Sequence, residues 1–194
     1  MKKFAIIVTK VFFRIFYRVE IINAGKIPVD GPVVICANHN TMLDMFFLGY
    51  RLKRWIHWMA KEELFKNPVL AFLILKLGGF PVKRGKGDVS SIKTAYRLLE
   101  KGKIVGIFPH GHRFKAGKAD TLRIKSGAAM IAANSGASIV PAAVLGNYKL
   151  FSPMKVIYGD PFKIDSAGKL GSVELSEISR QIVGKINALL EENQ

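Results

Sequence analysis

The chain has 194 residues, of which 49% are apolar, and its 30 Lys and Arg against 14 Asp and Glu give a formal net charge of +16. That length suits one domain with its own core, and a single cysteine, Cys36, excludes an internal disulfide. No run reaches the roughly 18 apolar residues that a membrane-spanning helix needs. A basic, apolar chain favours an anionic amphipathic partner such as a membrane surface, a lipid phosphate or an acidic carrier protein; nucleic acid is the other common partner of such a charge.

The first 24 residues predict an amphipathic helix. At about 100° per residue, apolar side chains cover much of its surface and four basic ones share a stripe: Lys3, Lys10, Arg14 and Arg18. This pattern is typical of a helix lying on a membrane, although a terminal helix packed on the domain is the alternative. We expect residues 1–24 to form a membrane-interfacial helix and residues 25–194 the folded domain of a monotopic protein on the cytoplasmic face of the cell membrane.

Beyond this arm, strand-like and helix-like periods alternate. The strand-like runs are 33–38, 55–60, 78–83, 103–108, 138–145 and 155–159. The helix-like runs are 44–52, 66–77, 88–101, 125–135 and 174–192. The helix over 88–101 is the clearest, because Asp88 is a suitable N-cap and Gly102 ends the pattern. The alternation predicts an α/β fold, a single layered domain with a mostly parallel sheet flanked by helices.

A histidine and an aspartate follow the first of these strands. His39 comes directly after it, and Asp44 falls in the first turn of the next helix. A carboxylate there can accept the Nδ1 proton of the histidine, which leaves Nε2 free to act as a base. Without a protein nucleophile, such a pair suits direct attack of a substrate hydroxyl on an activated acyl group. On spacing alone, a helix-capping Asp44 beside an ordinary loop histidine explains the pattern equally well.

Basic residues gather after two further strands. Arg84 ends one strand, Arg113 follows another, and Lys125 continues the charge. Ligands of α/β sheets bind where strands end, and arginines there can hold a phosphate through paired hydrogen bonds. Taken singly, each of these charges is typical of a solvated surface.

Four blocks of this chain together resemble the glycerolipid acyltransferase family, which includes bacterial 1-acyl-sn-glycerol-3-phosphate acyltransferases. Asn38-His39-x4-Asp44 matches the family's N-H-x4-D block in full. The other three follow in the family's order: a glycine-to-arginine strand at 78–84, F-P-E-G-T-R as Phe-Pro-His-Gly-His-Arg at 108–113, and Val-Pro at 140–141. The resemblance therefore covers the centre of the domain.

The resemblance implies an O-acyltransferase with His39 as the general base and Asp44 as its orienter. The acyl group would pass from an acyl carrier protein or coenzyme A thioester to a lysophospholipid, foremost 1-acyl-glycerol 3-phosphate, to make phosphatidic acid in phospholipid synthesis. No cofactor, metal or nucleic acid is implied. Arg84, Arg113 and Lys125 would hold the acceptor phosphate, with His110 and Gly111 in the same binding block. Apolar walls, including the helix over 66–77, would take the acyl chain.

Two residues depart from the family pattern. His110 stands where the family has glutamate, and His112 where it has threonine. Because that glutamate is associated with acceptor binding, the departure keeps open an acyltransferase that acts on another lysolipid or on a glycerol-phosphate acceptor.

Two alternatives belong to other functional classes. His39, Asp44, His110 and His112 could supply ligands for the zinc of a metal-dependent hydrolase, although no H-E-x-x-H motif or cysteine pair supports this. A basic nucleic-acid-binding protein is the other, although the charge is dispersed and no recognition motif is present.

Overall fold

The computed structural model describes residues 7, 11–83, 88–111, 124–164 and 170–193. Seven strands form one sheet in the order β1-β7-β6-β2-β5-β3-β4. All neighbouring strands are parallel except β6 and β7, which confirms the mostly parallel sheet. The strands are β1 Arg18–Ile22, β2 Val33–Ala37, β3 Ile56–Lys61, β4 Phe80–Val82, β5 Ile104–Ile107, β6 Ser138–Gly146 and β7 Pro153–Tyr158.

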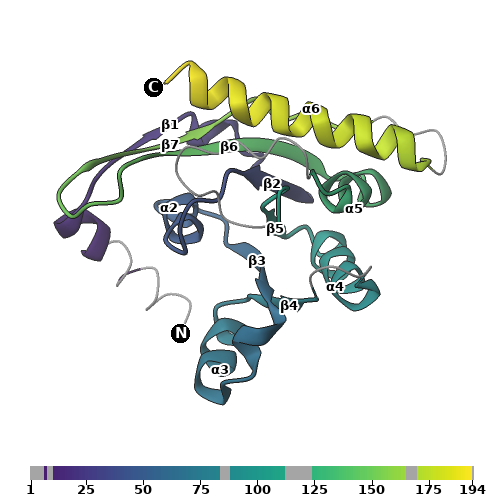
Figure 1. Ribbon diagram of the computed structural model, residues 1–194, viewed down its shortest axis with the longest axis horizontal. Helices are drawn as coiled ribbons and strands as arrows, with labels where there is room; N and C mark the ends of the chain where they lie inside the picture. Colours follow the sequence, from purple (N-terminus) through teal and green to yellow (C-terminus); the bar gives the residue numbers. More distant parts are fainter. Residues whose placement is uncertain (1–6, 8–10, 84–87, 112–123, 165–169, 194) are drawn as a thin grey trace.

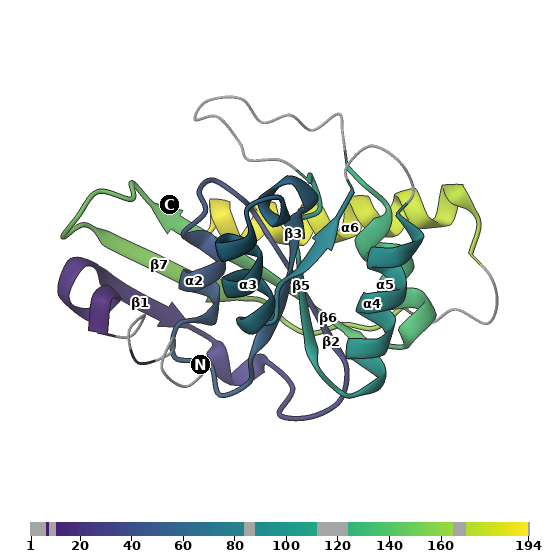
Figure 2. The same ribbon diagram turned by 90° about the horizontal axis from the view of Figure 1, so that it is seen from below.

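Helices cover both faces of the sheet (Figure 1). They are α2 Asp44–Gly49, α3 Pro68–Lys76, α4 Val89–Glu100, α5 Gly127–Ser135 and α6 Ser172–Glu191, with short 3-10 helices η1 Ala24–Lys26 and η2 Glu62–Phe65. One face carries α4, α5 and α6, and α4 packs beside α5 (Figure 2). The other face carries α2, whereas α3 projects from the side of the molecule opposite α6 (Figure 1).

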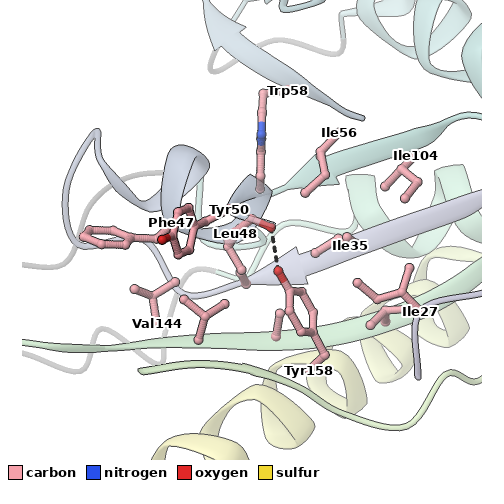
Figure 3. Packing of buried hydrophobic residues seen from close by; sticks show 14 of the residues in the cluster. Ile27, Ile35, Phe47, Leu48, Tyr50, Ile56, Trp58, Ile104, Val144 and Tyr158 are labelled. Atoms are coloured by element: carbon pink, nitrogen blue, oxygen red, sulfur yellow. Dashed lines mark hydrogen bonds between the residues drawn. The ribbon is translucent and has the colours of Figure 1, made fainter. Parts of the chain in front are cut away.

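The core follows from the alternation of side chains along the buried strands. Ile35 on β2 packs with α2 on one face, whereas Cys36 packs with α4, α5 and α6 on the other. On the α2 face, the hydroxyl of Tyr158 donates to the carbonyl of Leu48 at 2.5 Å (Figure 3). This bond satisfies a polar group inside an apolar cluster and ties α2 to β7.

The two central strands bring distant parts of the sequence together. β2 pairs with β5, and Cys36 stands opposite Ile107. Because the strands are parallel, the segments that follow them leave the sheet at the same edge. His39 follows β2 and Phe108 follows β5, so the sheet itself places these two residues side by side.

The N-terminal arm differs from the prediction. Residues 11–16 are helical, but Arg18–Ile22 forms strand β1, which pairs in parallel with β7 from Arg18 opposite Pro153 to Ile22 opposite Ile157. The prediction of one helix over 1–24 is therefore wrong for its last part. β-Branched Val19, Ile21 and Ile22 suit a strand, and the open edge of β7 supplies the backbone partners that helical periodicity cannot reveal.

Candidate active site

The loop between β2 and α2 is folded around the side chain of Asp44. This carboxylate is fully buried, and its Oδ2 accepts hydrogen bonds from the backbone N–H groups of Asn40 at 2.6 Å and Thr41 at 2.8 Å. The same oxygen lies 3.0 Å from Nδ1 of His39. The threonine hydroxyl in turn accepts from the backbone N–H of Leu43 at 3.1 Å, which holds the loop at the start of α2. The pairing expected from the five-residue spacing is thus present.

The orientation of the His39 ring follows from its two neighbours. Since the Asp44 oxygen already accepts from two backbone N–H groups, Nδ1 is the proton donor of the pair and the neutral ring carries its lone pair on Nε2. The ring also stacks on Phe108, with centroids 3.9 Å apart and planes 11° from parallel. The histidine is only 6% exposed, so both contacts restrict its rotation. The ring is therefore fixed in an orientation and tautomer that suit a general base.

Asn38 anchors the strand end that carries His39. Its side-chain amide donates to the carbonyl of Val144 on β6 at 2.9 Å and accepts from the N–H of the same residue at 2.8 Å. These two bonds continue the pairing of β2 with β6 by one step beyond Ala37. The asparagine of the N-H-x4-D block therefore has a structural role in placing the base.

Tyr148 is a site residue that the sequence reasoning missed. Its hydroxyl donates to Oδ1 of Asp44 at 2.6 Å and accepts from the side-chain amide of Asn40 at 3.3 Å. Burial first, and then the charge of Asp44 and the hydrogen bond to it, raise the pKa of Tyr148 well above its ordinary value. No local pattern marks this tyrosine, because 104 residues separate it from its partner.

An apolar cavity of about 440 Å³ is lined in part by Phe108, the residue on whose ring His39 stacks. His39 is not one of the lining residues, so Phe108 is the residue through which the histidine and the cavity are connected. The apolar walls come from β3, β4, β5, α4 and α5, and include Ile92, Ile107 and Ile131. The helix α3, expected among these walls, contributes no residue, and none of its side chains is buried. The prediction that this helix helps to take the acyl chain stays a prediction, because the cavity is not shown to be the acyl-chain site.

Charged groups also line the cavity. Lys83 at the end of β4 and Lys125 before α5 both line it, as does Asp88 at the start of α4. Gly111 lines it too, with φ +70° and its backbone against the side chain of Lys125. The structure thus brings the predicted residues Lys125 and Gly111 together at the cavity.

The remaining predicted site residues are placed only in part. His110 is buried in the turn directly after Phe108 and Pro109. Arg84 and Arg113, expected to hold a phosphate, lie outside the described residues, as does His112. Within the described part of the chain, no three His, Cys, Asp or Glu side chains are grouped so as to hold a metal ion.

Comparison with known proteins identifies the class to which this fold and site belong. A family model described as Acyltransferase matches residues 18–145, which is more than half of the chain. The chain therefore belongs to the acyltransferase family. It is 38% identical over 167 residues to the 1-acyl-sn-glycerol-3-phosphate acyltransferase of Bacillus subtilis (strain 168), covering 83% of this chain and 82% of that protein.

Two further relatives are more distant. The 1-acyl-sn-glycerol-3-phosphate acyltransferase of Streptococcus pneumoniae is 27% identical over 180 residues, which are 89% of this chain and 66% of that protein. The chloroplastic enzyme LPAT1 of Arabidopsis thaliana is 31% identical over 138 residues, which are 70% of this chain but 38% of the plant protein.

A solved structure shares the fold. The 1-acyl-sn-glycerophosphate (LPA) acyltransferase PlsC from Thermotoga maritima superposes with a TM-score of 0.73 at 22% identity, covering all of this chain and 82% of the other. The α/β architecture predicted from sequence periodicity is thereby confirmed.

Proposed function

We propose that this acyltransferase moves a fatty acyl group from an acyl thioester to the free hydroxyl of 1-acyl-sn-glycerol 3-phosphate, which makes phosphatidic acid for phospholipid synthesis. The buried pair of His39 and Asp44 beside an apolar cavity carries the proposal. The names of the relatives from Bacillus subtilis and Streptococcus pneumoniae support the choice of acceptor.

In this mechanism Nε2 of His39 takes the proton of the acceptor hydroxyl as its oxygen attacks the thioester carbonyl carbon. Asp44, bonded to Nδ1, keeps the ring in the right tautomer and stabilises the imidazolium that forms. The tetrahedral intermediate then collapses, the carbon–sulfur bond breaks, and the proton passes from the imidazolium to the departing thiolate. The products are an ester and a free thiol, so no metal or redox cofactor is needed.

We further propose that the donor is a thioester of acyl carrier protein or coenzyme A, and that the acceptor phosphate binds near Lys125 and Gly111. A chain of net charge +16 attracts either an acidic carrier or the phosphates of coenzyme A. Lys125 lies against Gly111 at the cavity, where a lysine ammonium can bind a phosphate. His110 in place of the family's glutamate keeps another lysolipid or glycerol 3-phosphate as the alternative acceptor.

Two exposed apolar surfaces support docking on an anionic membrane. In the N-terminal helix, Phe13 is buried against the domain, whereas Val11 and Ile15 are 52% and 57% exposed. On α3, Val69 and Phe72 are 69% and 52% exposed, and the other exposed apolar residues of this helix are Leu73 and Leu75. Among the described helices none combines the length and apolarity needed to cross a bilayer. We propose that both helices lie on the surface of the membrane, the basic charge of the chain facing anionic headgroups.

The catalytic proposal is tested by acyl transfer with purified protein in detergent. The donor is a labelled acyl thioester, and the acceptors are 1-acyl-sn-glycerol 3-phosphate, glycerol 3-phosphate and other lysophospholipids. We expect His39→Ala to lose at least about 100-fold in kcat, because the general base is removed. Asp44→Asn should fall similarly, whereas Asp160→Asn, the same change on an exposed side chain, should not. A folded His39→Ala protein with full activity would contradict the mechanism.

Membrane docking is tested by co-sedimentation with phosphatidylglycerol and phosphatidylcholine vesicles. We expect preference for the anionic vesicles and about a tenfold loss of binding for Val11→Ser with Ile15→Ser, and likewise for Val69→Ser with Phe72→Ser. Val173→Ser is the control, because Val173 is 75% exposed and belongs to α6, the helix on the side of the molecule opposite α3 (Figure 1). Equal binding by all variants would refute this orientation.

A further inference from the structure

The two oxygens of Asp44 are held by different parts of the molecule. Oδ2 accepts three hydrogen bonds, all from the local loop that contains Asn40, Thr41 and His39. Oδ1 accepts a hydrogen bond of 2.6 Å from the hydroxyl of Tyr148. Tyr148 lies in the connection between β6 and β7. Hydrogen bonds to both oxygens restrict rotation of the carboxylate more than bonds to Oδ2 alone would.

The backbone around Tyr148 is unusual for residues with side chains. Tyr148 has φ +59° and Phe151 has φ +64°, both in the left-handed region. Each such residue costs about 1 kcal/mol and persists where surrounding contacts hold it. We therefore expect contacts from outside the connection to hold these two residues in this conformation.

The N-terminal segment makes those contacts. The hydroxyl of Tyr17 donates to the carbonyl of Tyr148 at 3.3 Å, and the backbone N–H of Phe151 donates to the carbonyl of Phe16 at 2.6 Å. Arg18 at the start of β1 donates its backbone N–H to the carbonyl of Ser152 at 3.2 Å. The N-terminal segment is thus hydrogen-bonded to both left-handed residues of the connection, Tyr148 and Phe151.

The same segment also packs against the helix that carries Asp44. The ring of Phe47 on α2 lies 5.2 Å from the ring of Tyr17, 4.3 Å from that of Phe13 and 6.0 Å from that of Tyr148. Phe47 is fully buried in this aromatic cluster. The tyrosine that bonds Asp44 and the helix that begins with Asp44 are therefore held against each other by one piece of chain.

We propose that Tyr148 is a positioning residue of the His39–Asp44 pair, and that Tyr17 of the N-terminal segment holds it in place. Tyr148 reaches the carboxylate and not the reacting atoms, so it acts through Asp44. A tyrosine hydroxyl is protonated at physiological pH at its ordinary pKa of 10.0, and burial beside Asp44 raises the pKa of Tyr148 further, so the hydroxyl can donate. The kinetic test of this inference depends on the proposed acyl transfer, whereas the spectroscopic test does not.

The kinetic test is Tyr148→Phe, which removes the hydroxyl and keeps the ring in its cluster. A hydrogen bond to a charged group is worth enough that we expect kcat to fall about tenfold, with KM for the acceptor changed less than about twofold. Tyr96→Phe is the matched control, because its hydroxyl accepts from Asn134 on an exposed face of α4 and α5. An unchanged kcat in Tyr148→Phe, with an active wild type, would overturn the proposal.

A double-mutant cycle separates positioning from a general loss of structure. In the Asp44→Asn background, Tyr148→Phe should cost less than about twofold, because the carboxylate that Tyr148 positions has been replaced by a neutral amide. A full tenfold loss there would show that Tyr148 acts elsewhere. Tyr17→Phe should reduce kcat about two- to threefold in the wild-type background and have no further effect in Tyr148→Phe.

The spectroscopic test does not depend on activity. The Nδ1 proton of His39, hydrogen-bonded to a carboxylate, is followed by proton NMR and assigned by its absence in His39→Gln. We expect this resonance to shift in Tyr148→Phe and to stay in place in Tyr96→Phe. If Tyr148→Phe and the wild type gave identical spectra, the positioning role would be overturned, whether or not the wild type transfers acyl groups. If the resonance shifted in Tyr148→Phe but the wild type transferred no acyl group, the positioning role would be supported and only the proposed function refuted.

Discussion

At the scale of single residues, the short N-H-x4-D block is enough to predict the pairing of the base with its carboxylate. His39 and Asp44 meet as their spacing predicts, because the backbone N–H groups of Asn40 and Thr41 draw the intervening loop around the carboxylate. Burial then makes each partner indispensable to the other, since a buried polar group without its bond is costly. The base could be predicted locally, but its full set of contacts could not.

Gly111 provides a residue-scale prediction. With φ +70° and Lys125 Nζ 3.0 Å from where a Cβ would lie, Gly111→Ala strains the turn and displaces the ammonium group. We expect KM for the acceptor to rise about fivefold with a smaller change in kcat, because phosphate binding weakens. Gly136→Ala has nearly the same positive φ, +60°, with nothing within 4 Å, so it separates the strain from the displacement. Equal effects of both variants on KM would contradict the role of Lys125.

At the scale of elements, local capping signals determine the bounds of α4, whereas tertiary pairing determines that β1 is a strand. The helix α4 begins and ends where its caps predict: Asp88 Oδ1 accepts from the N–H groups of Ser90 at 3.0 Å and Ser91 at 3.2 Å, and Gly102 follows with φ +62°. The strand β1 lies within a pattern that also fits a helix, and only its pairing with β7 resolves the ambiguity. Caps act within a few residues, whereas a sheet edge acts across the whole chain.

The N-cap of α4 can be tested by its stability. Asp88 also accepts from the backbone N–H of Lys83 at 2.8 Å, and this bond, with those from the helix, lowers the pKa of Asp88. We expect Asp88→Ala to lose about 1 kcal/mol in the free energy of unfolding at neutral pH, measured with urea. A lowered pKa contributes stability that is lost as pH falls through the folded-state value, so the difference from wild type should shrink below pH 3.8. Asp160→Ala, at an exposed position, should show neither effect.

At the scale of the whole molecule, the sheet buries ionisable groups that resist losing their protons. Burial raises the pKa of Cys36 from 9.0 to about 12 and raises the pKa of Tyr158 above its ordinary value of 10.0. In the unfolded chain both groups ionise at their ordinary values. The native state therefore binds more protons above pH 9, and the stability present below that pH is lost as pH rises.

This predicts alkaline destabilisation with a separable contribution from the thiol. The free energy of unfolding should be nearly flat from neutral pH up to pH 9 and then fall, with Cys36 contributing about 1.4 kcal/mol for each pH unit above pH 9. In Cys36→Ala the fall should begin nearer pH 10, where the raised pKa values of Tyr148 and Tyr158 take effect. Urea unfolding at a series of pH values measures both slopes, and coincident curves would contradict the buried-thiol explanation.

The sequence alone determined the order of strands and helices beyond residue 24, the mostly parallel sheet, the pair of His39 and Asp44 and the family blocks around them. These follow from side-chain periodicity and short motifs, which operate within a few residues. Only the tertiary structure decided that Arg18–Ile22 is a strand, that α3 is exposed, and that Tyr148 completes the contacts of Asp44. The reason is physical: each of these outcomes depends on a partner, or the lack of one, far away in the chain, and no local pattern reports what the folded chain places beside a residue.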